Sequence, residues 1–202
     1  MSKRICNLVT LVSMVFSVLL TASAQAQASR FDCGTEALLE EGACVLSLFD
    51  VEVVVSSSGA GSINTLSIRL VDAATSASDE VDGSVYRAEI ADLNADGRPE
   101  VFAYVSSAGS GSYGSLVAYM IDDGLQLLPI SLPDLGDDTK VSAGYMGHDE
   151  FAVVETSLVR RFPLYHSGDV NAEPTGGTRN VTYKLKESAN GWALVVTQVN
   201  DY

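Results

Sequence analysis

The chain has 202 residues, of which 47% are hydrophobic, and its 26 acidic against 12 basic side chains give a formal net charge of -14. A field of this sign repels nucleic acid and anionic membrane surfaces, so we expect neither as a partner. The length suffices for a substantial hydrophobic core and requires no second folded domain.

The N-terminal segment has the pattern of a secretory signal peptide. MSKR is a short basic head, a mostly apolar centre follows, and TASAQAQAS contains overlapping Ala-x-Ala cleavage sites. Small polar residues follow the apolar centre in place of charged stop-transfer residues, so we expect cleavage after Ala26 or Ala28. This predicts a signal peptide over residues 1–28 and one exported, soluble domain over residues 29–202.

Cleavage removes Cys6 and leaves Cys33 and Cys44 as the cysteines of the mature chain. A single pair in an oxidising compartment typically forms a disulfide, and closing this short loop contributes about 2 to 3 kcal/mol in the chain-entropy model. Within the loop, Thr35 to Glu41 is the one segment with helical character. We therefore predict a disulfide-tied N-terminal segment with a short helix.

The rest of the chain consists of short runs with β-branched and alternating residues. Turn-rich segments separate many of them, such as SSSGAGS, Asp122-Asp123-Gly124 and Ala189-Asn190-Gly191. This pattern predicts an all-β, antiparallel sandwich or barrel-like single domain. The predicted β segments are residues 44–55, 66–72, 85–93, 100–107, 115–121, 125–130, 151–165, 180–188 and 191–199.

The stretch SAGSGSYGSL contains G-x-G-x-x-G at Gly109, Gly111 and Gly114, the spacing of dinucleotide-binding turns. Those turns require a following helix within a parallel βαβ unit, and here too few residues precede the next turn to form one. We therefore interpret the stretch as a connection between two strands. Tyr113 within it either folds back onto the end of the barrel or projects as a binding anchor.

Groups for catalysis are scarce in the mature chain. Neither Ser110 nor Ser112 lies in a G-x-S-x-G nucleophile elbow, and the histidines are only His148 and His166. The sequence also lacks a His/Cys cluster with metal-ligand spacing. We therefore expect a protein that is not an enzyme.

Four separated segments occur in order: DLNADGRPEVFAYVSSAGSGSYGSLVAYM, GYMGHDEFAVVETSLVRRFPLY, PTGGTRNVTYKL and GWALVV. From about Val85 to the end, and more weakly before it, they resemble the periplasmic inhibitors of i-type (invertebrate) lysozymes. The resemblance implies a protein of the bacterial periplasm whose loop Ser110-Gly111-Ser112-Tyr113 enters the lysozyme's active-site cleft. Hydroxyls of Ser110 and Tyr113 can donate to the paired carboxyl groups of a glycosidase.

The resemblance also leads us to expect a basic residue near the loop, yet no Lys or Arg occurs between Pro99 and Thr139. Arg160 and Arg161 are the candidates for a secondary contact from another strand, and internal ion pairs are the alternative. The expected partner is a basic lysozyme, because losing the two charges of the signal peptide takes the net charge from -14 to -16. The sequence leaves the oligomeric state open, a homodimer included.

An acidic stretch, Asp92-Leu93-Asn94-Ala95-Asp96-Gly97-Arg98-Pro99-Glu100, lies between two predicted strands. Oxygen ligands at Asp92, Asn94 and Asp96, a bend at a glycine and a carboxylate at Glu100 suit structural Ca²⁺. Alternatively, these side chains order a tight turn without metal. A calcium-stabilised β adhesion or carbohydrate-binding module of the envelope is therefore the alternative function.

Overall fold

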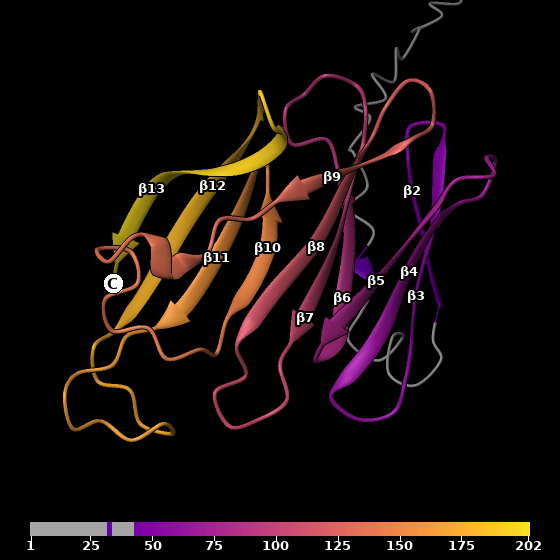
Figure 1. The fold of residues 1–202 in the computed structure, drawn as a ribbon. Helices are drawn as coiled ribbons and strands as arrows, with labels where there is room; N and C mark the ends of the chain where they lie inside the picture. The colour runs from indigo at the N-terminus through magenta and orange to yellow at the C-terminus, as the bar shows by residue number, and fades with distance from the viewer. Residues whose placement is uncertain (1–31, 34–42) are drawn as a thin grey trace, which may run out of the picture.

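The computed structural model describes residues 32–33 and 43–202 (Figure 1). These residues are almost entirely β structure, which confirms the all-β prediction. One short 3-10 turn, η1, spans Leu135–Asp137. The strands are β1 Asp32–Cys33, β2 Ala43–Leu48, β3 Val51–Ser58, β4 Ile63–Leu70, β5 Ser76–Asp82, β6 Ser84–Ala91, β7 Glu100–Ser106, β8 Gly114–Ile121, β9 Leu127–Ser131, β10 Glu150–Val154, β11 Ser157–Pro163, β12 Thr178–Ser188 and β13 Gly191–Asp201.

The strands form two sheets that together resemble a nearly closed barrel with a second layer. The nine-stranded sheet has the order β1-β6-β7-β8-β9-β13-β12-β11-β10, and the four-stranded sheet has the order β2-β3-β4-β5. All pairings are antiparallel except the short contact of β13 with β9. In Figure 1 the large sheet curls so that β10 to β13 face β6 to β8, while β2 to β5 cover the opposite side.

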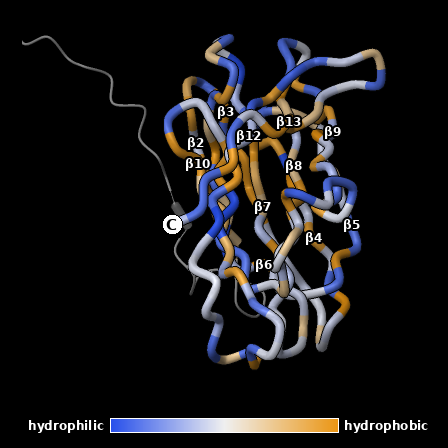
Figure 2. Tube along the Cα trace, turned by 90° about the vertical axis from the view of Figure 1, so that its left-hand side faces the viewer, coloured by the Kyte–Doolittle hydropathy of each residue, from blue (hydrophilic) through white to orange (hydrophobic). Residues whose placement is uncertain are grey.

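Strand β7 lies between two hydrophobic cores. Phe102 and Tyr104 point into the curled sheet, whereas Val101, Ala103 and Val105 pack toward the small sheet. All five side chains are fully buried. Burial on both faces explains why VFAYV, residues 101–105, is apolar without interruption, where a half-exposed strand would alternate. Figure 2 shows hydrophobic residues on such central strands and mainly hydrophilic loops at the ends.

Side chains bridge the gap between β6 and β10, where no ladder joins the ends of the large sheet. Glu89 of β6, only 3% exposed, accepts a hydrogen bond from the Val153 backbone N–H of β10 at 2.8 Å. It also accepts from the Tyr104 hydroxyl and pairs with Arg87. The Tyr104 ring stacks on Phe151 of β10, with centroids 5.6 Å apart. These contacts hold the curled sheet in its nearly closed form.

Two predicted segments are wrong, one strand was missed, and one expectation falls outside the described residues. The predicted segment 151–165 is two strands, β10 and β11, joined where Glu155 takes a φ of 53°. The predicted segment 44–55 is two strands, joined where Phe49 takes a φ of 53°. Strand β5, SASDEVD, was not predicted, because only Val81 of this edge strand is buried. The helix expected from Thr35 to Glu41 lies in the undescribed range 34–42. Among the described residues, no helix is long and apolar enough to cross a membrane.

The predicted bond between Cys33 and Cys44 is compatible with the backbone. β1, which carries Cys33, pairs with β6 and lies beside β2, which carries the buried Cys44. The Cys33 side chain lies outside the described part of the structure, so the bond stays a prediction. In protein recovered from the cell envelope, thiol labelling under denaturing, non-reducing conditions should detect no free cysteine. Two free thiols per mature chain would contradict the pairing.

Candidate functional site

The glycine-rich stretch connects β7 and β8 at the lower end of the molecule in Figure 1, as expected for a strand connection. Its ends are closed by hydrogen bonds from the Ser107 N–H to the Tyr113 carbonyl and from the Tyr113 N–H to Ser107 Oγ, each 2.9 Å. Gly109 has a φ of 122°, which only glycine adopts readily, and Ser112 lies at 42°. The stretch is therefore a compact loop rather than a flexible linker.

Two neighbouring segments hold the backbone of this loop. The His148 N–H donates to the Gly111 carbonyl at 2.8 Å, and Asn171 Nδ2 donates to the Ser110 carbonyl at 2.5 Å. The His148 ring and the Asn171 side chain contact each other as well, Nε2 to Oδ1, at 3.2 Å. A Cβ on Gly147 would lie 2.0 Å from the Gly111 oxygen, so only glycine permits this close approach. The loop is thus held from the segment before β10 and from the β11–β12 connection.

A buried ion pair supports the base of the loop. Asp149 accepts from the Gly114 N–H at 2.7 Å and from the Tyr145 hydroxyl at 2.6 Å. Arg160 Nε donates to the other Asp149 oxygen at 2.6 Å, and the two side chains are 6% and 0% exposed. Burial alone would lower the pKa of Arg160, but the bond to Asp149 outweighs it and raises that pKa. The pair, through the bond from the Gly114 N–H to Asp149, fixes the start of β8.

Arg160 accordingly does not lie where a secondary contact with an enzyme was expected. Its guanidinium also donates to the Tyr145 hydroxyl at 2.8 Å and lies over the Tyr145 ring, 5.1 Å from the centroid. The internal ion pair, the alternative weighed from the sequence, describes Arg160. Arg161 is exposed on the outer face of β11, in register with Glu150, beside an open pocket of about 430 Å³.

Tyr113 combines both of the interpretations left open by the sequence. Its ring packs edge-on against Tyr145, with centroids 5.6 Å apart, yet 49% of the residue is exposed. Tyr145 in turn packs against Phe162 of the core at 4.8 Å. Gly111 lets the ring lie over the loop, since a Cβ there would be 2.5 Å from Tyr113 Cε2. Tyr113 is therefore held on one side by Tyr145 and exposed to solvent on the other.

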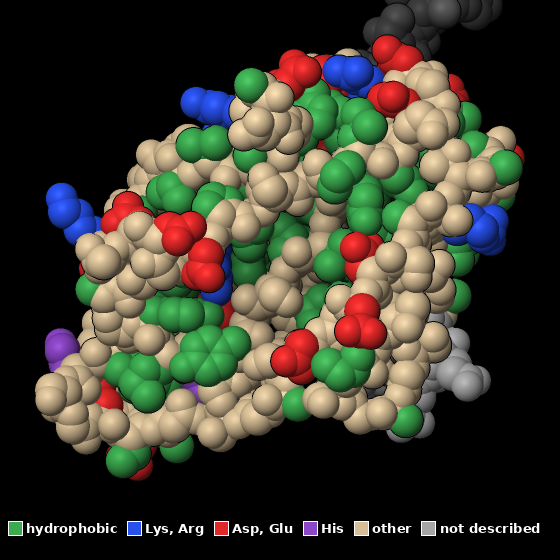
Figure 3. Space-filling view, in the orientation of Figure 1, with side chains coloured by type: hydrophobic (Ala, Val, Ile, Leu, Met, Phe, Trp, Pro, Cys, Tyr) green, Lys and Arg blue, Asp and Glu red, His purple; other side chains and the backbone are tan. Residues whose placement is uncertain are grey.

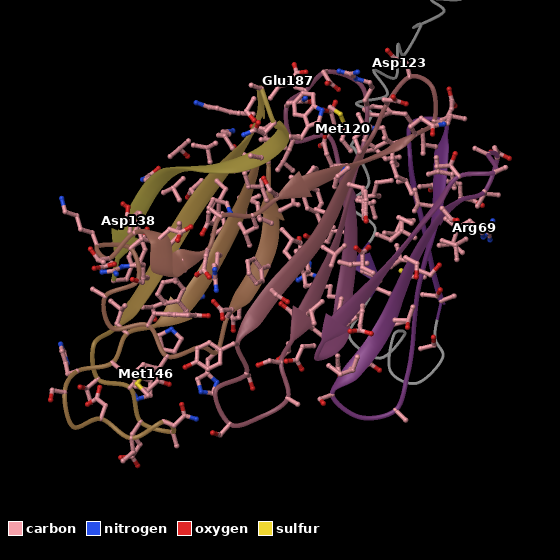
Figure 4. The ribbon with its side chains drawn as sticks, in the orientation of Figure 1. Arg69, Met120, Asp123, Asp138, Met146 and Glu187 are labelled. Atoms are coloured by element: carbon pink, nitrogen blue, oxygen red, sulfur yellow. The ribbon has the colours of Figure 1, made fainter. Side chains whose placement is uncertain are left out.

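Exposed apolar side chains extend the surface around Tyr113. Met146 is 40% exposed and Val170 is 59% exposed, and they lie close in sequence to the loop-binding residues His148 and Asn171. Figure 3 shows hydrophobic side chains at this lower end, and Figure 4 places Met146 there. These exposed apolar residues are candidates for contact with a partner protein.

The acidic stretch connects β6 and β7 at the opposite end of the molecule. Asp92 accepts from the N–H groups of Asp96 and Gly97 at 3.1 and 2.9 Å, and Asp96 accepts from the Arg98 N–H at 2.9 Å. The Arg98 guanidinium also pairs with Asp96 at 2.7 Å. The side chains thus order the turn, as the metal-free alternative expects. Among the described residues, no three His, Cys, Asp or Glu side chains form a ready metal site.

Glu100 ends this acidic stretch as the first residue of β7. Its side chain is fully buried, and burial raises the pKa of the carboxyl to about 8. The Leu93 N–H donates to it at 2.6 Å and partly offsets that shift, while Asp92 and Asp96 add to it.

Sequence reasoning missed the residues that support the loop, namely Tyr145, His148, Asp149 and Asn171. Their polar character inside GYMGHDEF and in the β11–β12 connection is visible in the sequence. Their contacts are not, because the supporting residues follow the loop by 35 to 61 positions. Only the curl of the large sheet brings them together.

Comparison with known proteins finds a family match that includes the loop. The family model of periplasmic lysozyme inhibitors of I-type lysozyme matches residues 45–135. This match confirms the resemblance and includes the loop from Ser110 to Tyr113, whereas the segments that resemble the family after residue 135 lie outside it. No curated protein and no solved structure matches the chain. The matched part of the chain is therefore similar to periplasmic inhibitors of I-type lysozyme.

Proposed function

We propose that the mature protein inhibits an I-type lysozyme by inserting the loop Ser110-Gly111-Ser112-Tyr113 into the enzyme's active-site cleft. One observation carries this proposal above the others. The loop backbone is fixed by Asn171 and His148, while half of the Tyr113 surface stays free for a partner. A loop fixed in this way loses less conformational entropy on binding than a free peptide would.

The side chains of the loop offer the chemistry that a glycosidase cleft requires. Within the described part of the chain, the hydroxyls of Ser110 and Tyr113 make no hydrogen bond, so they are available to a partner. Lysozyme-type glycosidases carry two carboxyl groups that flank the scissile bond. Hydroxyl donors to a carboxylate form short, charge-assisted bonds. Ser110 and Tyr113 would therefore occupy the carboxyl groups that the substrate needs.

The remaining surface fits such a partner. Met146 and Val170 would cover the rim of the cleft beside the inserted loop. The acidic mature chain would speed encounter with a basic lysozyme, and this effect should weaken as salt is raised. Arg161 faces outward from β11 and has no assigned role in this contact.

Asn171→Ala tests whether the hydrogen bond from Asn171 to the loop backbone is needed for inhibition. The variant loses the bond to the Ser110 carbonyl, so the loop must be ordered during binding, and the inhibition constant should rise about 5- to 30-fold. Stability should change by less than about 1 kcal/mol, because Asn171 lies in a surface connection. The measurements are lysozyme inhibition and thermal unfolding.

Asn190→Ala is the matched control, since Asn190 is an exposed residue in the β12–β13 turn, away from the loop. It should inhibit like the parent. If the two variants inhibit equally, the hydrogen bond from Asn171 to the loop has no part in inhibition.

One experiment distinguishes lysozyme inhibition from the alternative function, a β adhesion or carbohydrate-binding module. Purified mature protein is assayed for inhibition of I-type and other lysozymes, and separately for binding to peptidoglycan fragments. We expect inhibition of an I-type enzyme and no binding of the fragments alone. Fragment binding without inhibition of any lysozyme would favour the carbohydrate-binding module.

A further inference from the structure

The connection between β6 and β7 contains a buried polar atom that its protein surroundings leave unsatisfied. Glu100 is 0% exposed, and one of its carboxylate oxygens accepts from the Leu93 N–H at 2.6 Å. The other oxygen is buried and, within the described residues, has no hydrogen-bond partner. A buried polar atom without a partner is destabilising, more so if it is charged. A cation beside this oxygen would satisfy it and would favour the ionised carboxylate.

The backbone gathers further oxygen atoms on the same connection. Ala95 and Gly97 have φ values of 58° and 84°, which bend the chain sharply between Asp92 and Glu100. Asp92, Asn94 and Asp96 alternate along the bend, and Asp92 receives the N–H groups of Asp96 and Gly97. The bend therefore brings several side-chain oxygens onto one short connection, and a hard cation takes six to eight oxygen ligands.

We propose that this connection binds one Ca²⁺ ion. The ligands are the side-chain oxygens of Asp92, Asn94, Asp96 and Glu100, together with the Arg98 carbonyl. The unpartnered Glu100 oxygen becomes a ligand, which removes its unsatisfied state. Ca²⁺ fits this set better than Mg²⁺, because Mg²⁺ requires near-ideal octahedral geometry and retains several waters.

The side chain of Arg98 competes with the cation. Its guanidinium pairs with Asp96 Oδ2 at 2.7 Å and lies 3.9 Å from Asp123 of the β8–β9 turn. Binding exchanges this exposed ion pair for a metal–carboxylate bond, so Asp96 turns from Arg98 toward the ion. This exchange reconciles the proposed site with the absence of a ready group of three acidic ligands among the described residues.

The ion would act on stability rather than on the proposed lysozyme contact. Glu100 is the first residue of β7, the strand buried on both faces, so fixing the connection fixes the start of the central strand. The loop at Ser110 to Tyr113 follows the other end of the same strand. The calcium site and the inhibitory function can therefore fail independently.

The test is calorimetry and thermal unfolding of the mature protein in 0.01 to 10 mM CaCl₂, against the same protein in EDTA. We expect about one ion per chain and a melting temperature about 5 to 10 °C higher once free Ca²⁺ is about 100-fold above its Kd. The same concentrations of MgCl₂ should raise it much less. No heat of binding together with identical melting curves would overturn the proposal.

Variants of the β6–β7 connection distinguish calcium binding by specific ligands from a general effect of negative charge. Glu100→Gln keeps the shape of the side chain, so the protein should fold in EDTA at least as stably as the parent, yet lose the calcium response. Arg98→Ala removes the competing guanidinium and should lower the Kd about 3-fold or more. Asp123→Asn changes an acidic residue whose side chain is 89% exposed, and it should respond like the parent. If the Glu100 and Asp123 variants lose the calcium-dependent rise in melting temperature equally, the rise comes from screening of acidic charge in general. That result would overturn the proposed site.

Discussion

Tyr113→Ala is expected to raise the inhibition constant against an I-type lysozyme about 30- to 1000-fold, which corresponds to roughly 2 to 4 kcal/mol. The variant removes the one aromatic side chain of the loop, whose free face is 49% of the residue. In the cleft this ring would be surrounded by enzyme, where a buried tyrosine typically acts as a hot spot. The measurement is steady-state inhibition with purified variants.

Thermal unfolding of the Tyr113 variant is the control for folding, and one further substitution is the control for specificity. Tyr113→Ala should unfold at nearly the temperature of the parent, because the ring is half exposed and its contacts are with Tyr145 and the loop itself. Phe49→Ala removes an aromatic residue that is 58% exposed in the β2–β3 turn, and it should inhibit normally. A folded Tyr113→Ala variant that inhibits as well as the parent would exclude the loop as the inhibitory element.

Asp149→Ala is expected to destabilise the fold by about 3 to 5 kcal/mol. The substitution leaves the Arg160 guanidinium buried without its carboxylate, and removing one partner of a buried ion pair usually has an effect of this size. It also removes the acceptor for the Gly114 N–H, so the loop should lose its fixed position and inhibit less. Urea denaturation gives the free energy of unfolding. Asp149→Asn should lose less of this free energy than Asp149→Ala, because the amide oxygen can still accept a hydrogen bond.

Glu150→Ala is the matched control for this effect. Glu150 is the next acidic residue in the chain, it is exposed, and its cross-strand neighbour Arg161 is exposed as well. Its removal should change stability by no more than about 0.5 kcal/mol. Equal destabilisation by the Asp149 and Glu150 variants would show that the buried Asp149–Arg160 pair contributes no more to stability than an exposed acidic residue does.

The sequence predicts much of the fold, because local patterns encode it. VFAYV, within β7, has the uninterrupted apolar character of a strand buried on both faces, and Asp122-Asp123-Gly124 forms the turn expected between β8 and β9. β5 was missed because an edge strand with one solvent-facing side can consist almost entirely of Ser, Asp and Glu. The split at Phe49 was missed because a turn without Gly or Pro carries little sequence signal.

The site was predicted less completely, for a physical reason. The loop with Tyr113 could be recognised, since glycines around a lone aromatic residue are a local feature. The roles of Asp149, Arg160 and Asn171 depend on the curled sheet, and the sequence gives no measure of which arginine is buried. These supporting residues also lie outside the range 45–135 that matches the inhibitor family. The way the loop is held is therefore a feature that only the structure of this chain supplies.

The measurement that tests cleft insertion most directly is competition with an oligosaccharide that fills the active site of an I-type lysozyme. Inhibition by the mature protein is measured at rising concentrations of a chitin oligosaccharide. If the loop from Ser110 to Tyr113 enters the cleft, the apparent inhibition constant should rise in proportion to occupancy of the cleft by the oligosaccharide. An apparent inhibition constant that stays unchanged while the oligosaccharide saturates the cleft would show binding elsewhere on the enzyme and contradict insertion of the loop.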